Sequence, residues 1–418
     1  MVTHGAHSPE IDSSTLSFAI YIFFMNTPSI IYLTLVALWP RVPFITEPIE
    51  ILFLLQGTSY ITPSLLIIIL TILCLSLFQL IFVIIIAGTL SVWERKFFAA
   101  IQRRQGPVVS GMSGLLQFFA DGIKLFFKEL VSPIPSNQIT FFLAPIILFV
   151  TSLSGWAFIP QDFGYAFIDL ELNLVWSFTF TSCSVYGIIL AGWASNSKYA
   201  FLGSLRAAAQ MISYEISLGF IFICILLMSG SLNLTKIVLS QNTFWFLGSL
   251  FPLAIIFFIV ILAETNRPPF DLPEGESELV SGYHTEFSGI PFALFFLGEY
   301  SGMTLMSTIF VIFFLGGWLI FPNYFLNLSS YVFIYFGVYF AFIEKMFFLQ
   351  NIFGLIVHAL KTFFLMSLFI LVRAAFPRLR YDHLMNVGWK VLLPLTFGFL
   401  LFVITLLKYF KGFVTVML

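Results

Sequence analysis

Charge is scarce in this chain of 418 residues: only 9% of the residues are Asp, Glu, Lys or Arg, whereas 60% are hydrophobic. Soluble domains usually carry about 25% charged residues. The mean hydropathy of +1.02 and several uncharged apolar runs of about 20 residues are typical of a helical protein that crosses a membrane repeatedly. The net charge of −1 excludes a strongly basic nucleic-acid-binding surface. The sequence therefore predicts an all-α polytopic membrane protein with no nucleic-acid partner.

Cysteine is rare as well, and the three cysteines, Cys74, Cys183 and Cys224, all lie inside apolar runs. This arrangement contains no Cys-x-x-Cys pair and no disulfide framework. It lacks the usual sequence signatures of zinc sites and iron–sulfur clusters. The sequence therefore predicts no metal centre in this chain.

Basic residues are missing from the first 14 positions, which contain Glu10 and Asp12 but no Lys or Arg. This segment lacks the basic start of a signal peptide and the Arg-rich character of a transit peptide. Phenylalanine, in contrast, is abundant at 55 residues, more than helix packing in lipid requires. A high Phe content suits a gene in an AT-rich genome such as a mitochondrial one. Together these features favour the mitochondrial inner membrane, with a bacterial plasma membrane as the alternative.

Apolar runs along the chain predict eight membrane spans. They cover residues 64–90, 139–158, 174–194, 216–229, 244–263, 291–321, 363–372 with its upstream neighbours, and 391–407. A further apolar segment, 16–39, is either an additional N-terminal span or an interfacial segment. The predicted membrane domain is therefore 64–407, between an N-terminal extension, 1–63, and a C-terminal tail, 408–418.

Positive charge is distributed unevenly between the loops of this topology. The loops after the first, third, fifth and seventh spans contain thirteen of the nineteen Lys and Arg residues. By the positive-inside rule, that side faces the mitochondrial matrix or the bacterial cytoplasm. The same side carries an amphipathic segment, 111–130, in which Gln117, Asp121, Lys124 and Lys128 follow one helical stripe. We expect this segment to form a helix at the membrane interface.

Carboxylates are concentrated between Glu264 and Glu299, where seven of the twenty acidic residues fall within 36 positions. Glu264 and Glu299 themselves lie in apolar sequence, and Glu215 stands where another predicted span begins. A carboxylate in such a position is costly unless it is hydrated, paired or protonated. Several carboxylates close together would titrate as a coupled set, which is a property that a proton relay needs.

Ordered motifs extend across most of the chain. They include Glu94-Arg95-Lys96, Ser195-Asn-Ser-Lys-Tyr-Ala, Ser213-Tyr-Glu215, residues 263–282, and Arg373-Ala with Pro377-Arg378-x-Arg380-Tyr381-Asp382. In these motifs and in their order, the chain resembles the subunit 1 family of respiratory NADH:quinone oxidoreductase, complex I. It departs from the family at Val108 and Phe118, where Asn and Pro are usual. The N-terminal extension and an insertion at about 322–352 also fall outside the common pattern.

The resemblance implies an eight-helix subunit of a proton-translocating enzyme with NADH:ubiquinone reductase activity. Such a subunit forms a quinone-binding tunnel and its junction with the peripheral arm, and a row of buried acids links quinone reduction to proton translocation. It binds no cofactor itself; ubiquinone is the substrate, and FMN and the iron–sulfur clusters belong to partner subunits. The implied partners are peripheral-arm subunits, which carry the terminal iron–sulfur cluster and the quinone headgroup site, small and antiporter-like membrane-arm subunits, and membrane lipids.

Matched motif by motif, the resemblance implies two sets of site residues and no catalytic residue in this chain. The candidates near the quinone tunnel are Arg95, Lys96, Asp121, Arg267, Asp271 and Phe287. The candidates for the acidic path are Glu94, Glu215, Glu264, Glu276, Glu278, Glu286 and Glu299.

Three other classes of protein share part of this pattern. In a secondary transporter the intramembrane acids would coordinate Na⁺ or H⁺, although the sequence shows no inverted repeat. The homologous component of a membrane-bound hydrogenase would share the fold and the acidic loop without needing a quinone tunnel. A protein that served only as a structural anchor would not explain why acidic residues are concentrated between Glu264 and Glu299.

Overall fold

The computed structural model describes residues 61–162, 166–271, 280–319 and 347–409. The apolar segment 16–39, most of the insertion at 322–352, and the candidate acids Glu276 and Glu278 lie outside these residues. Within the described residues every regular element is a helix, which confirms the predicted all-α class.

Seven helical segments in this part of the chain are long and apolar enough to cross a membrane. They are α4 (Ile61–Ile101), α6 (Gln138–Ser154), α7 (Asn173–Ala194), α8 (Lys198–Ser229), α13 (Ile290–Phe314), α16 (Phe347–Ala375), and α17 (Tyr381–Asn386) continued by the π-helical residues Val387–Leu392 into α18 (Leu393–Tyr409). The fifth predicted span corresponds to α11 (Phe251–Glu264), a shorter apolar helix of 14 residues. Three short helices complete the set: α5 (Gln117–Phe126), α9 (Leu234–Ser240) and α10 (Phe246–Ser249).

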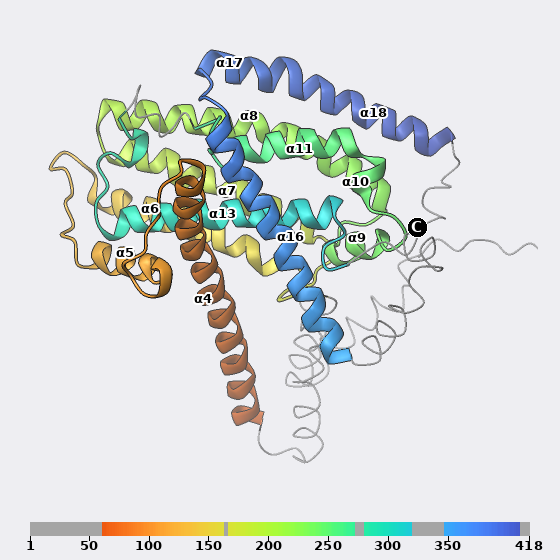
Figure 1. The fold of residues 1–418 in the computed structure, drawn as a ribbon, viewed down its shortest axis with the longest axis horizontal. Coiled ribbons are helices and arrows are strands. Elements are labelled where there is room, and N and C mark those ends of the chain that lie inside the picture. The colour runs from red at the N-terminus through yellow and green to blue at the C-terminus, as the bar shows by residue number, and fades with distance from the viewer. Residues whose placement is uncertain (1–60, 163–165, 272–279, 320–346, 410–418) are drawn as a thin grey trace, which may run out of the picture.

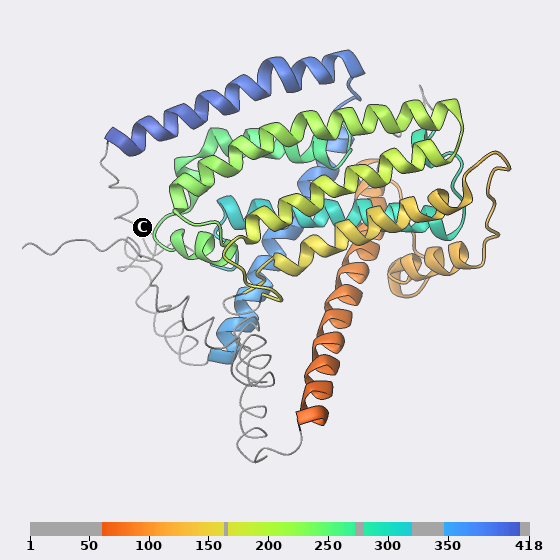
Figure 2. The same ribbon diagram turned by 180° about the vertical axis from the view of Figure 1, so that it is seen from behind.

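The helices form a bundle that two long helices cross. Neighbouring pairs α6 and α7, α7 and α8, and α6 and α13 pack together, and α11 and α18 both pack on α8 (Figure 1, Figure 2). Helices α4 and α16 run at a steep angle to this group and both contact α13 (Figure 1). The backbone N–H of Asn137 donates to the carbonyl of Ala194 at one end of the bundle, and that of Leu174 donates to Leu232 at the other. The loops on either side of α7 thus lie at opposite ends of the bundle, as the predicted topology requires.

Phenylalanine fills the core between α8, α11 and α13. The ring of Phe257 is fully buried, and its centroid lies 5.7 Å from that of Phe313, 5.8 Å from that of Phe310 and 6.2 Å from that of Phe222. Such aromatic pairs contribute about 0.5–1.5 kcal/mol each beyond the burial of their area. The high Phe content suggests an AT-rich genome. In this core the Phe rings also stabilise the packing between α8, α11 and α13.

Several helix boundaries differ from the predicted ones; for example, α4 ends at Ile101 rather than at residue 90. Helix α13 ends at Phe314 rather than at residue 321, because Gly316 and Gly317 have φ angles of 67° and 53°, a conformation that residues with a Cβ rarely adopt. The last membrane helix begins at Tyr381 rather than at residue 391, since the polar residues before the apolar run are helical too. The amphipathic helix covers only 117–126 of the predicted 111–130, so Lys128 lies beyond its end.

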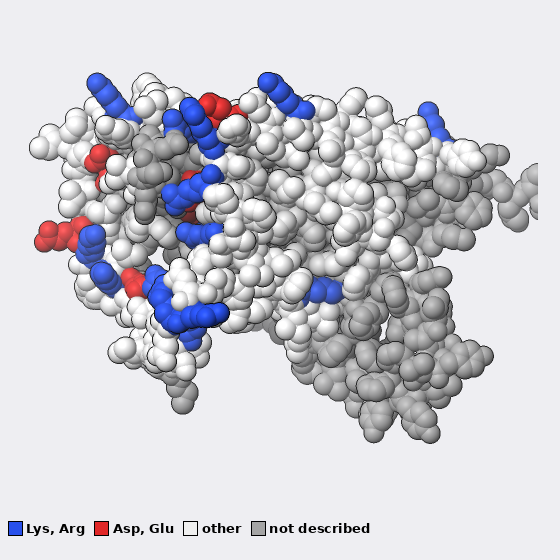
Figure 3. Space-filling view, turned by 45° about the horizontal axis from the view of Figure 1, so that its top comes forward, with Lys and Arg blue, Asp and Glu red and all other residues white. Residues whose placement is uncertain are grey.

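Charged side chains gather at one end of the bundle, which we call the charged end (Figure 3). The C-terminal end of α4, helix α5, and the loops before α8, α13 and α17 meet there. Most of the remaining surface in this view is uncharged. This segregation is the one expected for a membrane protein whose basic loops face a single compartment.

Candidate functional site

Glu94 is the centre of a buried charge network at the charged end. Its carboxylate pairs with Arg373 of α16, and its Oε2 accepts a hydrogen bond of 2.6 Å from the Tyr300 hydroxyl of α13. Nη1 of Arg267 lies 3.9 Å from the same oxygen, and the Arg267 guanidinium lies 4.3 Å from the centroid of the Tyr300 ring. A buried carboxylate needs such partners because they replace its lost hydration.

A second buried carboxylate, Asp271, lies in the loop after α11. Its Oδ2 is 3.5 Å from Nη2 of Arg378. The backbone N–H of Leu379 donates to the carbonyl of Pro269 at 3.0 Å, which ties this loop to the one after α16. Burial raises the pKa of Asp271 above its ordinary value, although the nearby arginines act in the opposite direction. Asp271 therefore takes up a proton at a higher pH than an exposed aspartate does.

Glu299, the neighbour of Tyr300 on α13, is held by a turn at residues 282–284. The Tyr283 hydroxyl donates to Oε1 of Glu299 at 2.6 Å, and Nε2 of His284 lies 3.1 Å from the same oxygen. The turn approaches α8 closely, since a Cβ on Gly203 would lie only 2.8 Å from Cα of Gly282. Close packing of backbone on backbone thus positions the two partners of Glu299.

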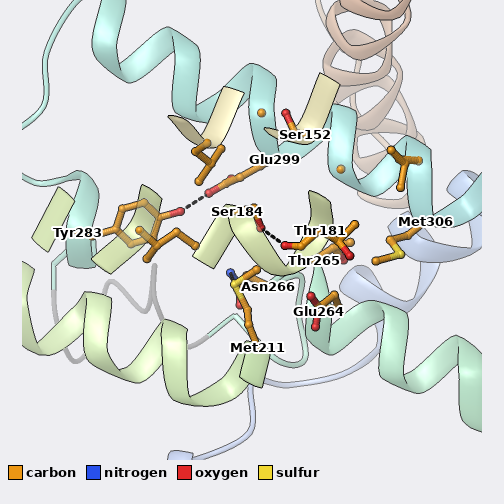
Figure 4. A pocket seen from close by; sticks show the side chains of 15 residues that line it. Ser152, Thr181, Ser184, Met211, Glu264, Thr265, Asn266, Tyr283, Glu299 and Met306 are labelled. Atoms are coloured by element: carbon orange, nitrogen blue, oxygen red, sulfur yellow. Dashed lines mark hydrogen bonds between the residues drawn. The ribbon is translucent and has the colours of Figure 1, made fainter. Parts of the chain in front are cut away.

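A pocket with a mostly apolar lining adjoins Glu299 between α6, α7, α8 and α13 (Figure 4). Its volume is about 570 Å³, including the part that is open to the surroundings. Glu264, the last residue of α11, lies across the pocket from Glu299, and the hydroxyl groups of Ser152, Thr181 and Ser184 line the space around them. Water occupies a buried site when the site is roomy and offers several polar partners. The pocket therefore has the chemistry to hold water between two carboxylates.

Glu264 and Glu215 continue the row of acids beyond the pocket. Glu264 is buried, and its Oε2 has no hydrogen-bond partner within the described ranges. Glu215 of α8 lies close enough to Glu264 for the two charges to interact, and it accepts a hydrogen bond from the Ser182 hydroxyl of α7. No described Lys or Arg lies within 4.0 Å of either carboxylate. These acids thus lack the cationic partners that surround Glu94.

Two of the predicted quinone-tunnel residues lie at the surface of the charged end. Arg95 and Asp121 form an ion pair of 2.7 Å that joins α4 to α5. Lys96 is half-buried under the loop between these helices, where a Cβ on Gly106 would lie 3.2 Å from its Cα. Phe118, one of the departures from the family pattern, packs on α4 where a Cβ at Gly88 would lie 2.7 Å from its ring.

The other predicted residues divide between the network and its surroundings. Arg267 and Asp271 lie with Glu94, as described above. Phe287 is buried in a neighbouring apolar core, where its ring stacks on Phe141 with centroids 4.1 Å apart. Glu286 is half-buried beside it. Arg267 thus connects Glu94 with Glu299, and the pocket and Glu264 connect Glu299 with Glu215. We call these four acids the acidic row; Phe287 and Glu286 are not part of it.

Sequence reasoning missed the partners that hold these acids. Arg373, Tyr300, Tyr283 and His284 all contact a candidate carboxylate, yet none was predicted as a site residue. Tyr300 directly follows Glu299, which is the one local signal for it. The pairing of Arg373 with Glu94 spans 279 positions, so no spacing within a motif could reveal it.

The fold and the site define a polytopic α-helical membrane protein with buried and half-buried carboxylates in a charge network and around an adjoining pocket. A family model described as NADH dehydrogenase matches residues 73–404. The chain therefore belongs to this family.

Curated relatives carry more specific names. The chain is 50% identical over 318 residues to NADH-ubiquinone oxidoreductase chain 1 of Chondrus crispus, covering 76% of this chain and 91% of that protein. It is 51% identical over 303 residues to the protein of the same name in Arabidopsis thaliana, covering 72% of this chain and 86% of that one. It is 49% identical over 317 residues to a subunit of the NADH-quinone oxidoreductase of Paramagnetospirillum magneticum, covering 76% and 86% respectively.

Proposed function

We propose that this chain is the core membrane subunit of a proton-translocating NADH:ubiquinone oxidoreductase that forms the quinone-binding tunnel and passes the energy of quinone reduction to a row of buried acids. One observation carries the proposal: Arg267 links Glu94 to Glu299, Glu299 and Glu264 line one pocket, and Glu264 interacts with Glu215, in a chain about 50% identical to proteins named as parts of such an enzyme. Neither a transporter nor a component of a hydrogenase has comparable support.

The charged end is the proposed junction with the peripheral arm. Arg95 and Asp121 lie on its surface, Lys96 is half-buried beneath a loop, and Arg267 and Asp271 are buried behind them. A quinone that accepts two electrons becomes a strong base and takes up two protons. Charged side chains and hydrogen-bond donors near the tunnel would stabilise that developing charge, and a carboxylate with a raised pKa such as Asp271 is suited to exchange protons with it.

The acidic residues then transmit the change in charge caused by quinone reduction away from the quinone site. Arg267 lies within electrostatic reach of Glu94, Asp271 and Glu299. A change of charge near Asp271 would therefore alter the field at Glu299, and from there the charge balance of Glu264 and Glu215 across the pocket. Interacting carboxylates of this kind share protons as one coupled set. This coupling is the proposed link to proton translocation.

The proposal extends to the rest of the complex. FMN and the iron–sulfur clusters belong to peripheral-arm partners, and the described residues contain no cluster of three or more His, Cys, Asp or Glu residues that could hold a metal ion. Ubiquinone is the substrate, and antiporter-like membrane subunits and lipids are the neighbours in the membrane. We favour the mitochondrial inner membrane, although relatives come from bacteria as well as from eukaryotes.

Purification through a tag on this chain tests the class of protein. We expect recovery of a large flavin- and iron–sulfur-containing assembly whose NADH:quinone reductase activity is abolished by a quinone-site inhibitor such as rotenone. A lone chain without redox activity would contradict the proposal and favour a transporter.

Substitution of Glu264 tests the acidic row. In the assembled complex, we expect Glu264→Gln to lower inhibitor-sensitive quinone reduction at least about tenfold, equivalent to ~1.4 kcal/mol in the barrier. NADH oxidation by an artificial acceptor should persist, because that reaction ends in the peripheral arm. Glu171→Gln, at an exposed site on the opposite end of the bundle, is the matched control. Equal loss of both activities would contradict a specific role for the row.

A further inference from the structure

A second buried polar cluster lies at the end of α13 that is remote from the acids. Lys361, a residue of α16, directs its ammonium group at the turn that follows α13. Its Nζ donates hydrogen bonds to the carbonyls of Leu315 at 2.7 Å and Gly317 at 3.1 Å, and also to that of Leu319. The same Nζ lies 4.5 Å from the centroid of the Trp245 ring. All of these partners are neutral groups.

The end of α13 and the turn after it offer partners to an ammonium group. A charged side chain within a membrane-spanning helix is costly unless it has partners. The last carbonyls of a helix lack intrahelical donors and carry the negative end of the helix dipole. Lys361 therefore provides a donor and a positive charge at the C-cap carbonyl of α13, that of Leu315, and further donors for the turn beyond it. The aromatic face of Trp245 adds a cation–π contact.

The turn itself is shaped for this contact. Nε2 of Gln241 donates to the carbonyl of Ile312 at 2.7 Å, and Oε1 of the same residue accepts the Gly316 N–H at 3.1 Å. A Cβ on Gly316 would lie 2.8 Å from Nε1 of Trp245. Glycine at this position thus lets the turn pack against Trp245 and present its carbonyl groups to Lys361.

The two helices that Lys361 joins also meet at the charged end. Tyr300 on α13 and Arg373 on α16 both bind Glu94. Lys361 precedes Arg373 by 12 residues, which is about 18 Å along the helix. Helices α13 and α16 are therefore connected at two distant points, one at the acids and one at Lys361.

We propose that Lys361 is a positioning residue for the acidic row: by holding the end of α13 against α16, it keeps Tyr300 and Arg373 in register on Glu94. This inference rests on the proposed function, because the acids must carry the coupling for their alignment to matter. It predicts an effect on turnover rather than on quinone affinity, since Lys361 lies far from the residues proposed to contact quinone.

The test compares Lys361→Met with Lys408→Met in the assembled complex. Methionine keeps the length and apolar character of the lysine stem but removes the charge. Lys408 is an exposed lysine near the end of α18, so its substitution controls for the loss of one membrane lysine. We expect Lys361→Met to lower kcat for a short-chain quinone about fivefold with KM changed less than about twofold. Lys408→Met should leave both constants unchanged.

Two further measurements separate positioning from a general loss of structure. Hydrogen exchange of the backbone amides at 311–319 should become faster in Lys361→Met, while exchange in α6 stays the same, because only the end of α13 is released. Lys361→Arg keeps a cation at the turn and should recover at least about half of the lost kcat. If Lys361→Met does not assemble, Gln241→Leu weakens the same turn without removing a charge and should shift exchange and kcat in the same direction.

The outcomes are distinguishable from a failure of the proposed function. If Glu264→Gln impairs quinone reduction while Lys361→Met behaves like Lys408→Met, the positioning role is wrong and the proposed function stands. Loss of both quinone reduction and artificial-acceptor activity in Lys361→Met, without rescue by arginine, would also overturn it. If Glu264→Gln has no effect, the proposed function itself fails.

Discussion

Glu94 and Glu264 are both buried carboxylates in apolar helices, but their surroundings are opposite. Glu94 contacts two arginines and a tyrosine hydroxyl. Glu264 faces a mostly apolar pocket that contains a few hydroxyl groups, and one of its oxygens has no described hydrogen-bond partner. A buried carboxylate with cationic partners holds its charge firmly. One without them responds to changes in its neighbours. The same residue type thus holds a fixed charge at Glu94. At Glu264 its charge state depends on neighbouring groups.

This contrast is explained by where the arginines come from. Arg267 and Arg373 belong to segments at the charged end, where helices leave the apolar bundle. Glu264 is only three positions before Arg267, but it is the buried last residue of α11, and Glu215 lies in the middle of α8. A cation so placed would be hard to keep inside the membrane. Water in the pocket is the remaining means of solvating these acids.

Removal of the Glu94 charge should have the largest effect on stability. We expect Glu94→Gln to destabilise the chain by about 3 kcal/mol, because it removes the carboxylate that pairs with the buried Arg267 and the half-buried Arg373. Thermal unfolding of the purified complex and the amount of assembled complex would report this loss. The double variant Glu94→Gln with Arg373→Met should recover part of it, since the pair is then removed together.

Glu264→Gln is the internal comparison for that experiment. We expect it to preserve thermal stability to within about 1 kcal/mol, because a neutral amide is easier to bury than an unpaired carboxylate. A loss of stability as large as that of Glu94→Gln would contradict the claim that Glu94 and Glu264 have different surroundings.

Asp271 should produce a smaller, pH-dependent effect. Its pKa is raised in the folded protein, so between the ordinary and the raised value the folded chain keeps a proton that the unfolded chain has released. Stability from this residue therefore falls as the pH rises through that window. We expect Asp271→Asn to flatten the dependence of the thermal midpoint on pH, starting near the ordinary value of about 4. An unchanged slope would refute the raised pKa.

The exposed pair of Arg95 and Asp121 should contribute least to stability. Its side chains remain 52% and 34% exposed, and exposed ion pairs typically contribute about 0.2–1 kcal/mol. A double-mutant cycle with Arg95→Ala and Asp121→Ala should give a coupling energy in that range, which decreases at high salt. A coupling energy above about 2 kcal/mol would mean that this pair is buried in the assembled complex.

Much of the fold followed from the pattern of apolar runs. Each of the eight predicted spans has a helical counterpart, because a stretch of about 20 uncharged residues has few alternatives in a membrane. The ends of the helices were less predictable. The end of α13 depends on two glycines inside an apolar run, and the start of the last helix includes charged residues that resemble a loop.

The site was predicted in its residue types but not in its connections. Glu94, Glu264 and Glu299 stand out in the sequence because carboxylates are costly in apolar segments. Lys361 does not stand out, since a single lysine beside an apolar run looks like an ordinary anchor. Its function depends on three carbonyl groups from a turn that is more than 40 positions away.

The sequence by itself determined that this chain is a helical membrane protein with its basic loops on one side and rare acids inside, because hydrophobicity and charge act through their position along the chain. Only the tertiary structure decided which acid is paired and which faces a pocket. Arg373 reaches Glu94, and Lys361 reaches the end of α13, because distant helices pack together, and the contacts of a buried charge depend on that packing rather than on neighbours in sequence.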